Sequence, residues 1–197
     1  MKILVVAARP NELKIIKDWI KSANLKEKLD IDYFCCWVWN YEVISSLERY
    51  LALNNVPIFI RNIWICGCFL STNKVESQLV QIASVINLYT NKEFIIPPFL
   101  KIAPLKTCFS GENIVFEKSD ISDEICINND EIYLDMESRW IEFVCSKYKI
   151  PRLILRVPFD LLSYWNNKVY VDKINELLSK LPYSIYLQRI LDWIKHQ

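Results

Sequence analysis

The chain alternates between short, almost continuously apolar runs and segments in which apolar residues recur every three or four positions. The apolar runs predict β-strands buried on both faces, and the periodic segments predict helices with one buried side. Strands are expected at 2–8, 32–39, 58–66, within 79–89 and 100–109, at 131–135 and at 152–157, and helices at 11–22, 42–54, 138–148, 172–181 and 184–195. This alternation is typical of an α/β layered domain.

The segment 138–148 shows the helical pattern clearly. Its apolar side chains are spaced for one buried face, namely Trp140, Ile141, Val144, Cys145 and Tyr148. The charged residues Glu142 and Lys147 fall outside this stripe, so both are expected to face solvent.

Length and composition favour a single domain over residues 1–197, because 52% of the 197 residues are hydrophobic and no linker interrupts them. The net charge of +1 gives no general attraction to nucleic acid or to acidic membranes. No apolar run reaches the ~18 residues of a membrane span, and the first strand begins too close to Met1 for a signal peptide. We therefore expect a cytoplasmic protein with no membrane or nucleic-acid partner.

The seven cysteines, an odd number, are expected to be reduced thiols that mostly lie in the core. Cys66 and Cys68 are too close together for a usual zinc site, and His196, the only histidine, is the penultimate residue. These features argue against metal catalysis and against a nucleophilic triad that uses histidine. No metal and no cofactor is expected.

Two carboxylates follow two apolar strands in the stretch from Tyr133 to Asp160. Glu137 comes just after the strand at 131–135, and Asp160 just after the strand at 152–157. Because ligands of open α/β sheets bind at the carboxyl ends of strands, the two acids are candidates for one shared pocket. The alternative is that Asp160 only caps a following helix and Glu137 only begins the preceding one.

The order of residues in this stretch resembles a known family signature. Asp135-Met136-Glu137 is followed by a helix, by Ile150-Pro151 and then by Arg156 and Asp160. This order is similar to the C-terminal signature of the nucleoside phosphorylase and nucleosidase superfamily, and most similar to that of the methylthioadenosine/S-adenosylhomocysteine nucleosidases. The resemblance implies a three-layer α/β/α fold with a central mixed, twisted sheet flanked by helices.

Further matches to the same family lie closer to the N-terminus. The first apolar strand is followed by Glu12, Gly67 stands at the expected end of the strand 58–66, and Ser110-Gly111 begins an S-G-E motif. Gly67 and Gly111 are the only glycines in the chain, whereas average usage near 7% would give about fourteen. We therefore expect both glycines to be needed where they stand.

By resemblance, the protein would be a nucleosidase, an N-ribosyl hydrolase that releases the base of a purine nucleoside such as methylthioadenosine or S-adenosylhomocysteine. Asp160 would protonate the departing base, and Glu12 would orient or deprotonate the attacking water. Glu137 would hold the ribose hydroxyls, and Met136 would pack under the sugar. The remaining substrate contacts would come from Gly67, Cys68, Ser110 and Gly111, and the family implies a homodimer.

Three other functions stay open. Futalosine hydrolases share the three acids and differ in the 5′ side of the substrate. A purine nucleoside phosphorylase would need a phosphate cradle, but the loop from Ala8 to Glu12 has no glycine and carries an acid. The third is a degenerate member that binds a nucleoside without turnover, since Gly67-Cys68-Phe69-Leu70 is bulky where the family has small residues, and Phe159 replaces its serine.

Overall fold

A computed structural model describes most of the chain. The described residues are 2–8, 10–22, 30–36, 40–54, 59–70, 79–98, 100–112, 120–129, 131–159, 176, 189, 190 and 192. The predicted C-terminal helices at 172–181 and 184–195 lie outside these ranges, apart from the last four single positions.

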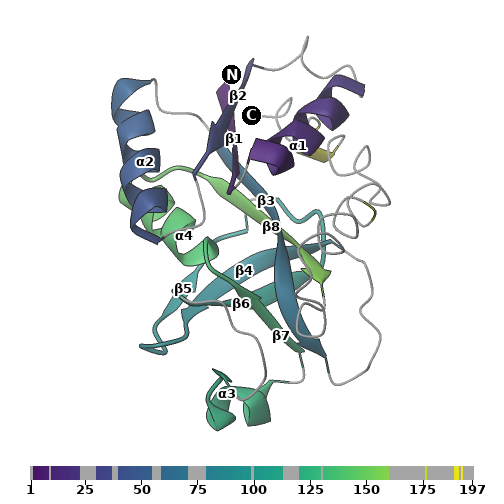
Figure 1. Ribbon diagram of the computed structural model, residues 1–197, viewed down its shortest axis with the longest axis vertical. Coiled ribbons are helices and arrows are strands. Elements are labelled where there is room, and N and C mark those ends of the chain that lie inside the picture. The colour runs from purple at the N-terminus through teal and green to yellow at the C-terminus, as the bar shows by residue number, and fades with distance from the viewer. Residues whose placement is uncertain are drawn as a thin grey trace.

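The described elements follow the predicted alternation (Figure 1). The strands are β1 (Lys2–Ala7), β2 (Asp30–Cys35), β3 (Phe59–Leu70), β4 (Val80–Asn87), β5 (Glu93–Ile95), β6 (Leu105–Ser110), β7 (Glu131–Asp135) and β8 (Arg152–Phe159). The helices are α1 (Pro10–Ser22), α2 (Asn40–Leu53), α3 (Asp123–Asn128) and α4 (Ser138–Lys147). The short elements β5 and α3 were not predicted, because three and six residues carry too little periodicity to be recognised.

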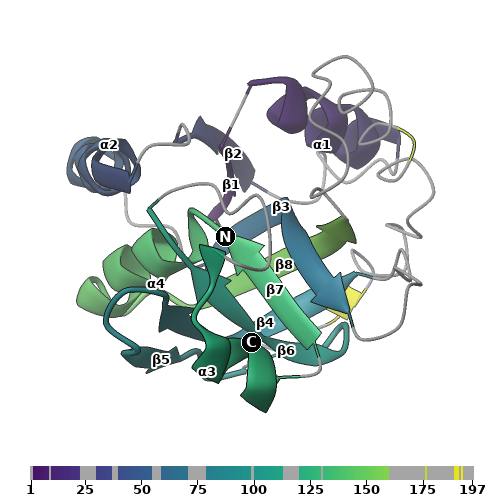
Figure 2. The same ribbon diagram turned by 60° about the horizontal axis from the view of Figure 1, so that its bottom comes forward.

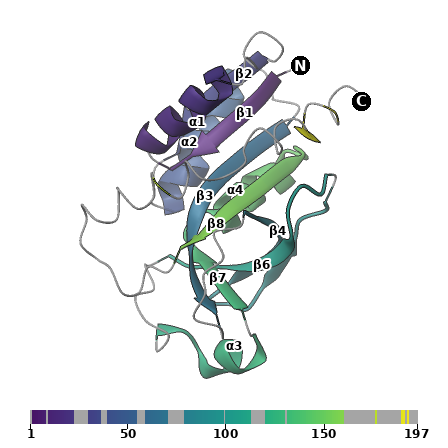
Figure 3. The same ribbon diagram turned by 90° about the vertical axis from the view of Figure 1, so that its right-hand side faces the viewer.

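The described strands form one mixed sheet in the order β2-β1-β3-β7-β6-β4-β5, and β8 pairs with both β3 and β4. β1 and β8 run parallel to β3, and β2 runs parallel to β1, whereas β7 is antiparallel to β3. Because β8 bridges β3 and β4, the sheet curls back on itself instead of staying open (Figure 3). The predicted mixed, twisted sheet flanked by helices is confirmed.

Helices cover the two faces of the β1 end of this sheet. The side chains of Ile3 and Val5 pack with Leu13 and Ile16 of α1 on one face. On the other face, β1 packs against α2 and α4, which lie side by side in Figure 1, through Leu4, Val6, Val43, Leu47, Ile141 and Val144. This double coverage explains why β1 reads as a continuous apolar run. A smaller cluster joins α3 to β6 and β7 at the far end of the molecule (Figure 2).

The strand that carries Gly67 is longer than predicted. β3 was expected to end at Cys66, but it continues to Leu70, so Gly67 lies inside the strand and not at its end. The extension is held by antiparallel pairing with β7, in which Gly67 lies opposite Leu134 and Leu70 opposite Glu131. The segment Gly67-Cys68-Phe69-Leu70 is therefore strand throughout.

The solvent-facing position expected for Glu142 is also wrong. Glu142 is 2% exposed, and its carboxylate accepts hydrogen bonds from Arg152 Nε at 2.6 Å and from Ser146 Oγ at 2.6 Å. A charged side chain becomes buried when a partner neutralises it, and here the partner is supplied by the first residue of β8. The pair fixes α4 to that strand.

Candidate active site

Glu12 lies at the carboxyl end of β1, in the first turn of α1. Its side chain is 2% exposed, and its Oε2 accepts a hydrogen bond from the backbone N–H of Ala8 at 2.9 Å. Pro10 begins the helix, where its missing N–H costs nothing, and an acid in the first turn interacts favourably with the helix dipole. The local sequence therefore places a buried carboxylate just beyond the end of a central strand.

Glu137 lies at the corresponding place before α4. It is the N-cap residue of that helix and is 3% exposed, and its backbone carbonyl accepts from Trp140 N and Ile141 N. Its side chain makes no capping hydrogen bond. Asp135 does this instead, because its carboxylate accepts from Ser138 N at 3.2 Å and 3.3 Å. The backbone of Glu137 therefore begins the helix, as the alternative expected, but this role does not account for its buried carboxylate.

The register of the sheet brings Glu12 and Glu137 toward the same part of β3. Val6 of β1 lies opposite Asn62, and Leu134 of the antiparallel β7 lies opposite Gly67. The chain leaving β1 and the chain leaving β7 therefore approach the stretch of β3 between those two residues.

The charges of both carboxylates, Glu12 and Glu137, affect the pKa of the Cys36 thiol. Burial raises the pKa of the Cys36 thiol well above its usual value, and the negative charges of Glu137 and Glu12 raise it further. Cys36 is fully buried just after β2, and its N–H donates to Ala7 O at 2.9 Å. The Cys36 thiol therefore lies at the carboxyl ends of β1 and β2.

A buried ion pair lies behind Glu137. Arg156 of β8 is fully buried, its Nε donates to Asp135 Oδ2 at 2.7 Å, and its Nη2 donates to Ser138 Oγ at 2.6 Å. Burial lowers the pKa of the Arg156 guanidinium, but the charges of Asp135 and Glu137 outweigh this and raise it above its ordinary value. The arginine is therefore held charged beside the start of α4.

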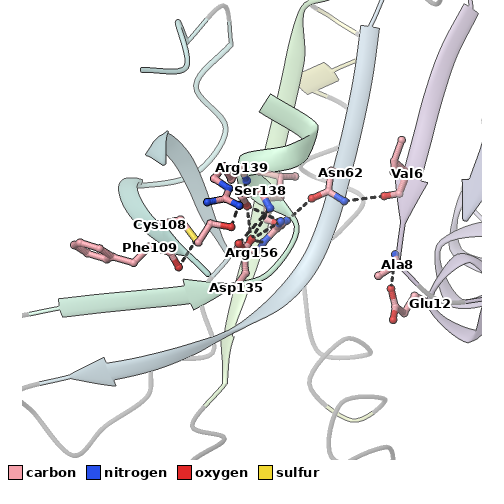
Figure 4. Close-up of polar contacts among 12 residues, drawn as sticks. Val6, Ala8, Glu12, Asn62, Cys108, Phe109, Asp135, Ser138, Arg139 and Arg156 are labelled. Carbon is pink, nitrogen blue, oxygen red and sulfur yellow. Dashed lines mark hydrogen bonds and ion pairs between the residues drawn. The ribbon is translucent and has the colours of Figure 1, made fainter. Parts of the chain in front are cut away.

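Asn62 of β3 connects this ion pair to β1. Its Oδ1 accepts from Arg156 Nη1, and its Nδ2 donates to Val6 O at 3.1 Å. Figure 4 shows the resulting chain of contacts from Asp135 and Ser138 through Arg156 and Asn62 to β1, with Glu12 bonded to Ala8 beyond it.

Ser110 and Gly111 hold the end of β6 against the start of α4. Ser110 is fully buried, and its Oγ accepts from Arg139 N at 3.4 Å. Gly111 N donates to Asp135 O at 3.0 Å. Both predicted substrate contacts therefore lie beside Met136, which is half-buried and directly precedes Glu137.

Gly67 and Cys68 lie in the C-terminal part of β3, which pairs with β7. Cys68 is 3% exposed and its side chain packs in the apolar cluster with Cys108 and Tyr133. Its thiol therefore belongs to the core, which leaves the backbone as the part that a ligand could reach. Neither Gly67 nor Gly111 has a positive φ, so backbone conformation does not require glycine at either position.

The predicted general acid, Asp160, lies outside the described residues. The last described residue before Asp160 is Phe159, which ends β8 opposite Gly67. In the part of the chain that the structure describes, no group of three or more His, Cys, Asp or Glu side chains is arranged to hold a metal ion. None of the helices in those ranges has both the length and the apolar character that a bilayer crossing requires.

The polar network formed by Asn62, Asp135, Ser138 and Arg156 was not predicted from the sequence. One signal was present. Asn62 and Arg156 each interrupt an apolar strand, and a charge or an amide in a central strand must find a buried partner. The identity of the partners was not readable, because they come from strands far apart in sequence.

No protein-family model matches this sequence, and no curated protein is significantly similar to it. Solved structures are similar in fold. A futalosine hydrolase mutant of Helicobacter pylori strain 26695 has a TM-score of 0.75 and 11% identity, with 98% of this chain and 99% of that chain covered. The chain has the fold of the nucleosidases.

Two further structures give the same result. An MTA/SAH nucleosidase has a TM-score of 0.75 and 15% identity, with 100% of this chain and 96% of that chain covered. The 5′-methylthioadenosine nucleosidase of Arabidopsis thaliana in its apo form has a TM-score of 0.72 and 13% identity, with 99% and 95% covered. At these identities the likeness extends to the fold, and it agrees with the fold that the sequence motifs predicted.

Proposed function

We propose that this protein is an N-ribosyl hydrolase that cleaves the glycosidic bond of a purine nucleoside and releases the free base. The observation that carries the proposal is that two buried carboxylates, Glu12 and Glu137, follow β1 and β7, whose ends lead toward the same stretch of β3. Burying a carboxylate is costly, so the presence of two buried carboxylates after neighbouring parts of the sheet supports a chemical role. The likeness in fold to nucleosidases supports the same role.

The chemistry assigns one task to each acid. Glu12 accepts a proton from a water whose oxygen attacks the anomeric carbon of the ribose. Asp160 donates a proton to the purine as the carbon–nitrogen bond breaks, and Glu137 holds the ribose hydroxyls while positive charge develops on the sugar. Hydrolysis is favoured over phosphorolysis because the buried Glu12 carboxylate would repel a phosphate.

The 5′ substituent distinguishes the candidate substrates. Methylthioadenosine, S-adenosylhomocysteine and futalosine differ on that side, and both nucleosidases and a futalosine hydrolase share the fold. We propose methylthioadenosine or S-adenosylhomocysteine as the substrate class, with futalosine as the alternative. A homodimer in the cytoplasm is part of the same proposal, and light scattering of the purified protein tests the dimer.

A second candidate is a protein that binds a nucleoside without cleaving it. The continuation of β3 through Gly67 to Leu70, with pairing to β7, favours this candidate, because bulky strand residues stand where the family has small ones. The buried carboxylates of Glu12 and Glu137 weigh against it.

One assay separates these functions. The protein is incubated with methylthioadenosine, S-adenosylhomocysteine and futalosine, with and without inorganic phosphate, and the free base is measured by chromatography. We expect base release that does not depend on phosphate. Release that requires phosphate would make the protein a phosphorylase, and binding of a nucleoside without release would make it a non-catalytic binder.

A further inference from the structure

Asn62 lies in the interior of the sheet, and both the donor and the acceptor group of its side-chain amide form hydrogen bonds. It is 2% exposed, and its Nδ2 donates to Val6 O while its Oδ1 accepts from Arg156. A buried amide costs free energy unless its donor and acceptor groups are both satisfied. The side chain therefore joins two specific partners, one on each neighbouring strand of β3.

The position of Asn62 in the strand ladder is specific. The register between β1 and β3 runs from Ile3 opposite Phe59 to Val6 opposite Asn62 and goes no further. The Asn62 amide thus holds β1 where its backbone pairing with β3 ends. Beyond this point β1 leads to Ala8, whose N–H fixes the Glu12 carboxylate.

The Oδ1 end of the Asn62 amide is connected, through Arg156, to residues next to Glu137. Arg156, whose Nη1 donates to Asn62 Oδ1, also donates to Asp135 and to Ser138. These two residues flank Met136-Glu137, and Asp135 also caps α4 through Ser138 N. The network therefore contacts the residues on both sides of Met136-Glu137 and holds this turn in place.

We propose that Asn62 is a positioning residue that sets the separation between the carboxylates of Glu12 and Glu137. The inference rests on the proposed function for its catalytic consequence, but the separation itself is a property of the fold. In the proposed reaction one acid must meet the water and the other the ribose, and misplacement by about 1 Å can cost roughly 10²-fold in rate. Asn62 is the described side chain that contacts both β1 and the ion pair behind Glu137.

Two substitutions separate the two halves of the amide. Asn62→Leu removes both contacts at similar volume. Asn62→Asp keeps an oxygen acceptor for Arg156 but loses the donor to Val6 O. The matched control is Arg152→Met, which breaks the buried Glu142–Arg152 pair between α4 and the other end of β8.

Activity is the first measurement, with unfolding followed in parallel. For Asn62→Leu and Asn62→Asp we expect kcat to fall by about 10-fold to 100-fold with KM within about threefold of the parent value. For Arg152→Met we expect a lower melting temperature and a parental kcat. Parental kcat in both Asn62 variants, or an equal fall in the control, overturns the proposal.

The second measurement does not need activity. Side-chain carboxyl signals of ¹³C-labelled glutamate are titrated in each variant, with Glu12→Gln and Glu137→Gln providing the assignments. A change in separation alters the interaction between the two charges, so we expect the titrations of Glu12 and Glu137 to move by about 0.5 pH unit or more in Asn62→Leu, which adds no charge of its own, and not in the control.

The two measurements also separate the two proposals. A parent protein that releases no base from any nucleoside defeats the proposed function, and the titrations still decide the role of Asn62. Unchanged titrations of both acids in a folded Asn62→Leu protein overturn the positioning role even if the parent is active. If Asn62→Leu does not fold, Asn62→Ser, which is shorter and also adds no charge, replaces it in both measurements.

Discussion

Arg156 Nη2 lies 2.6 Å from Asp135 Oδ2, and the two side chains are 0% and 1% exposed, so the ion pair between β8 and β7 is sealed from water. Such a pair is not by itself a large source of stability, because burying both charges costs about as much as their attraction returns. The ion pair matters because replacing either residue by a neutral one leaves the other side chain charged, buried and without its counter-charge.

The first prediction concerns this pair. We expect Asp135→Asn to lower the free energy of unfolding by about 3–5 kcal/mol, because the Arg156 guanidinium loses its counter-charge. Replacement of both residues in Asp135→Leu/Arg156→Met should cost less than the single change, and urea denaturation measures all three proteins. The control is Glu131→Gln, which breaks the partly exposed Lys106–Glu131 pair and should cost about 1 kcal/mol or less. Equal losses for Asp135→Asn and Glu131→Gln would contradict the argument.

The second prediction tests the acids of the proposed reaction. Glu12→Gln and Asp160→Asn should each lower kcat by roughly 10²-fold or more, with little change in melting temperature, since proton transfer contributes on that scale. The exposed Glu93→Gln serves as the control and should behave as the parent. A fully active variant would remove that acid from the mechanism. An unfolded Asp160→Asn would instead support the helix-capping role of Asp160.

The third prediction concerns Gly67. Because its φ is not positive and it lies inside β3, Gly67→Ala should leave the fold intact and raise stability by up to about 1 kcal/mol. If the substrate approaches the backbone there, the added methyl group should raise KM by about 10-fold or more. Calorimetric melting and steady-state kinetics measure the two effects. An unchanged KM would exclude Gly67 from the substrate contacts.

The fourth prediction is a pH dependence. Burial raises the pKa of the Cys145 thiol from 9.0 to about 12. Between pH 9 and 12 the unfolded thiol loses its proton while the folded one keeps it, so this group destabilises the fold by up to about 1.4 kcal/mol for each pH unit above 9. Below pH 9 the effect is absent.

Cys145→Ala removes this dependence. The variant should be less stable than the parent at pH 8, because it leaves a small cavity, and the difference in unfolding free energy should narrow by about 1 kcal/mol at pH 10. Val144→Ala is the matched control, since Val144 is equally buried in the same helix and has no proton to lose. A difference that stays constant for both variants between pH 8 and 10 would refute the linkage.

The sequence was sufficient for the elements that a local pattern defines. The apolar run of β1 predicted a strand covered on both faces, and the predicted stripe of α4 is buried at Ile141, Val144 and Cys145. The predicted stripe is wrong for Tyr148, which is 37% exposed, and Trp140 is only partly buried. Placing Glu12 and Glu137 after two strands needed only the order of residues along the chain. These features depend on neighbours a few positions apart, so the sequence alone carries them.

The same local pattern was wrong for Glu142 and for the end of β3. A charged residue beside an apolar stripe usually faces solvent, but Arg152 reaches Glu142 only after β8 has taken its place in the sheet. Similarly, nothing in the residues after Cys66 marks the continuation of β3, since the pairing partner is β7, about 60 residues later in the chain.

The tertiary structure decided which polar residues meet. The sequence by itself determined the strands, the helices beside them and the acids at their ends, because backbone geometry and side-chain periodicity act over a few residues. That Asn62, Asp135 and Arg156 form one buried network, and that this network joins β1 to the start of α4, depends on strand order and register. Those are fixed by the packing of the whole sheet, where the cost of an unsatisfied buried charge or amide selects the one arrangement that satisfies them all.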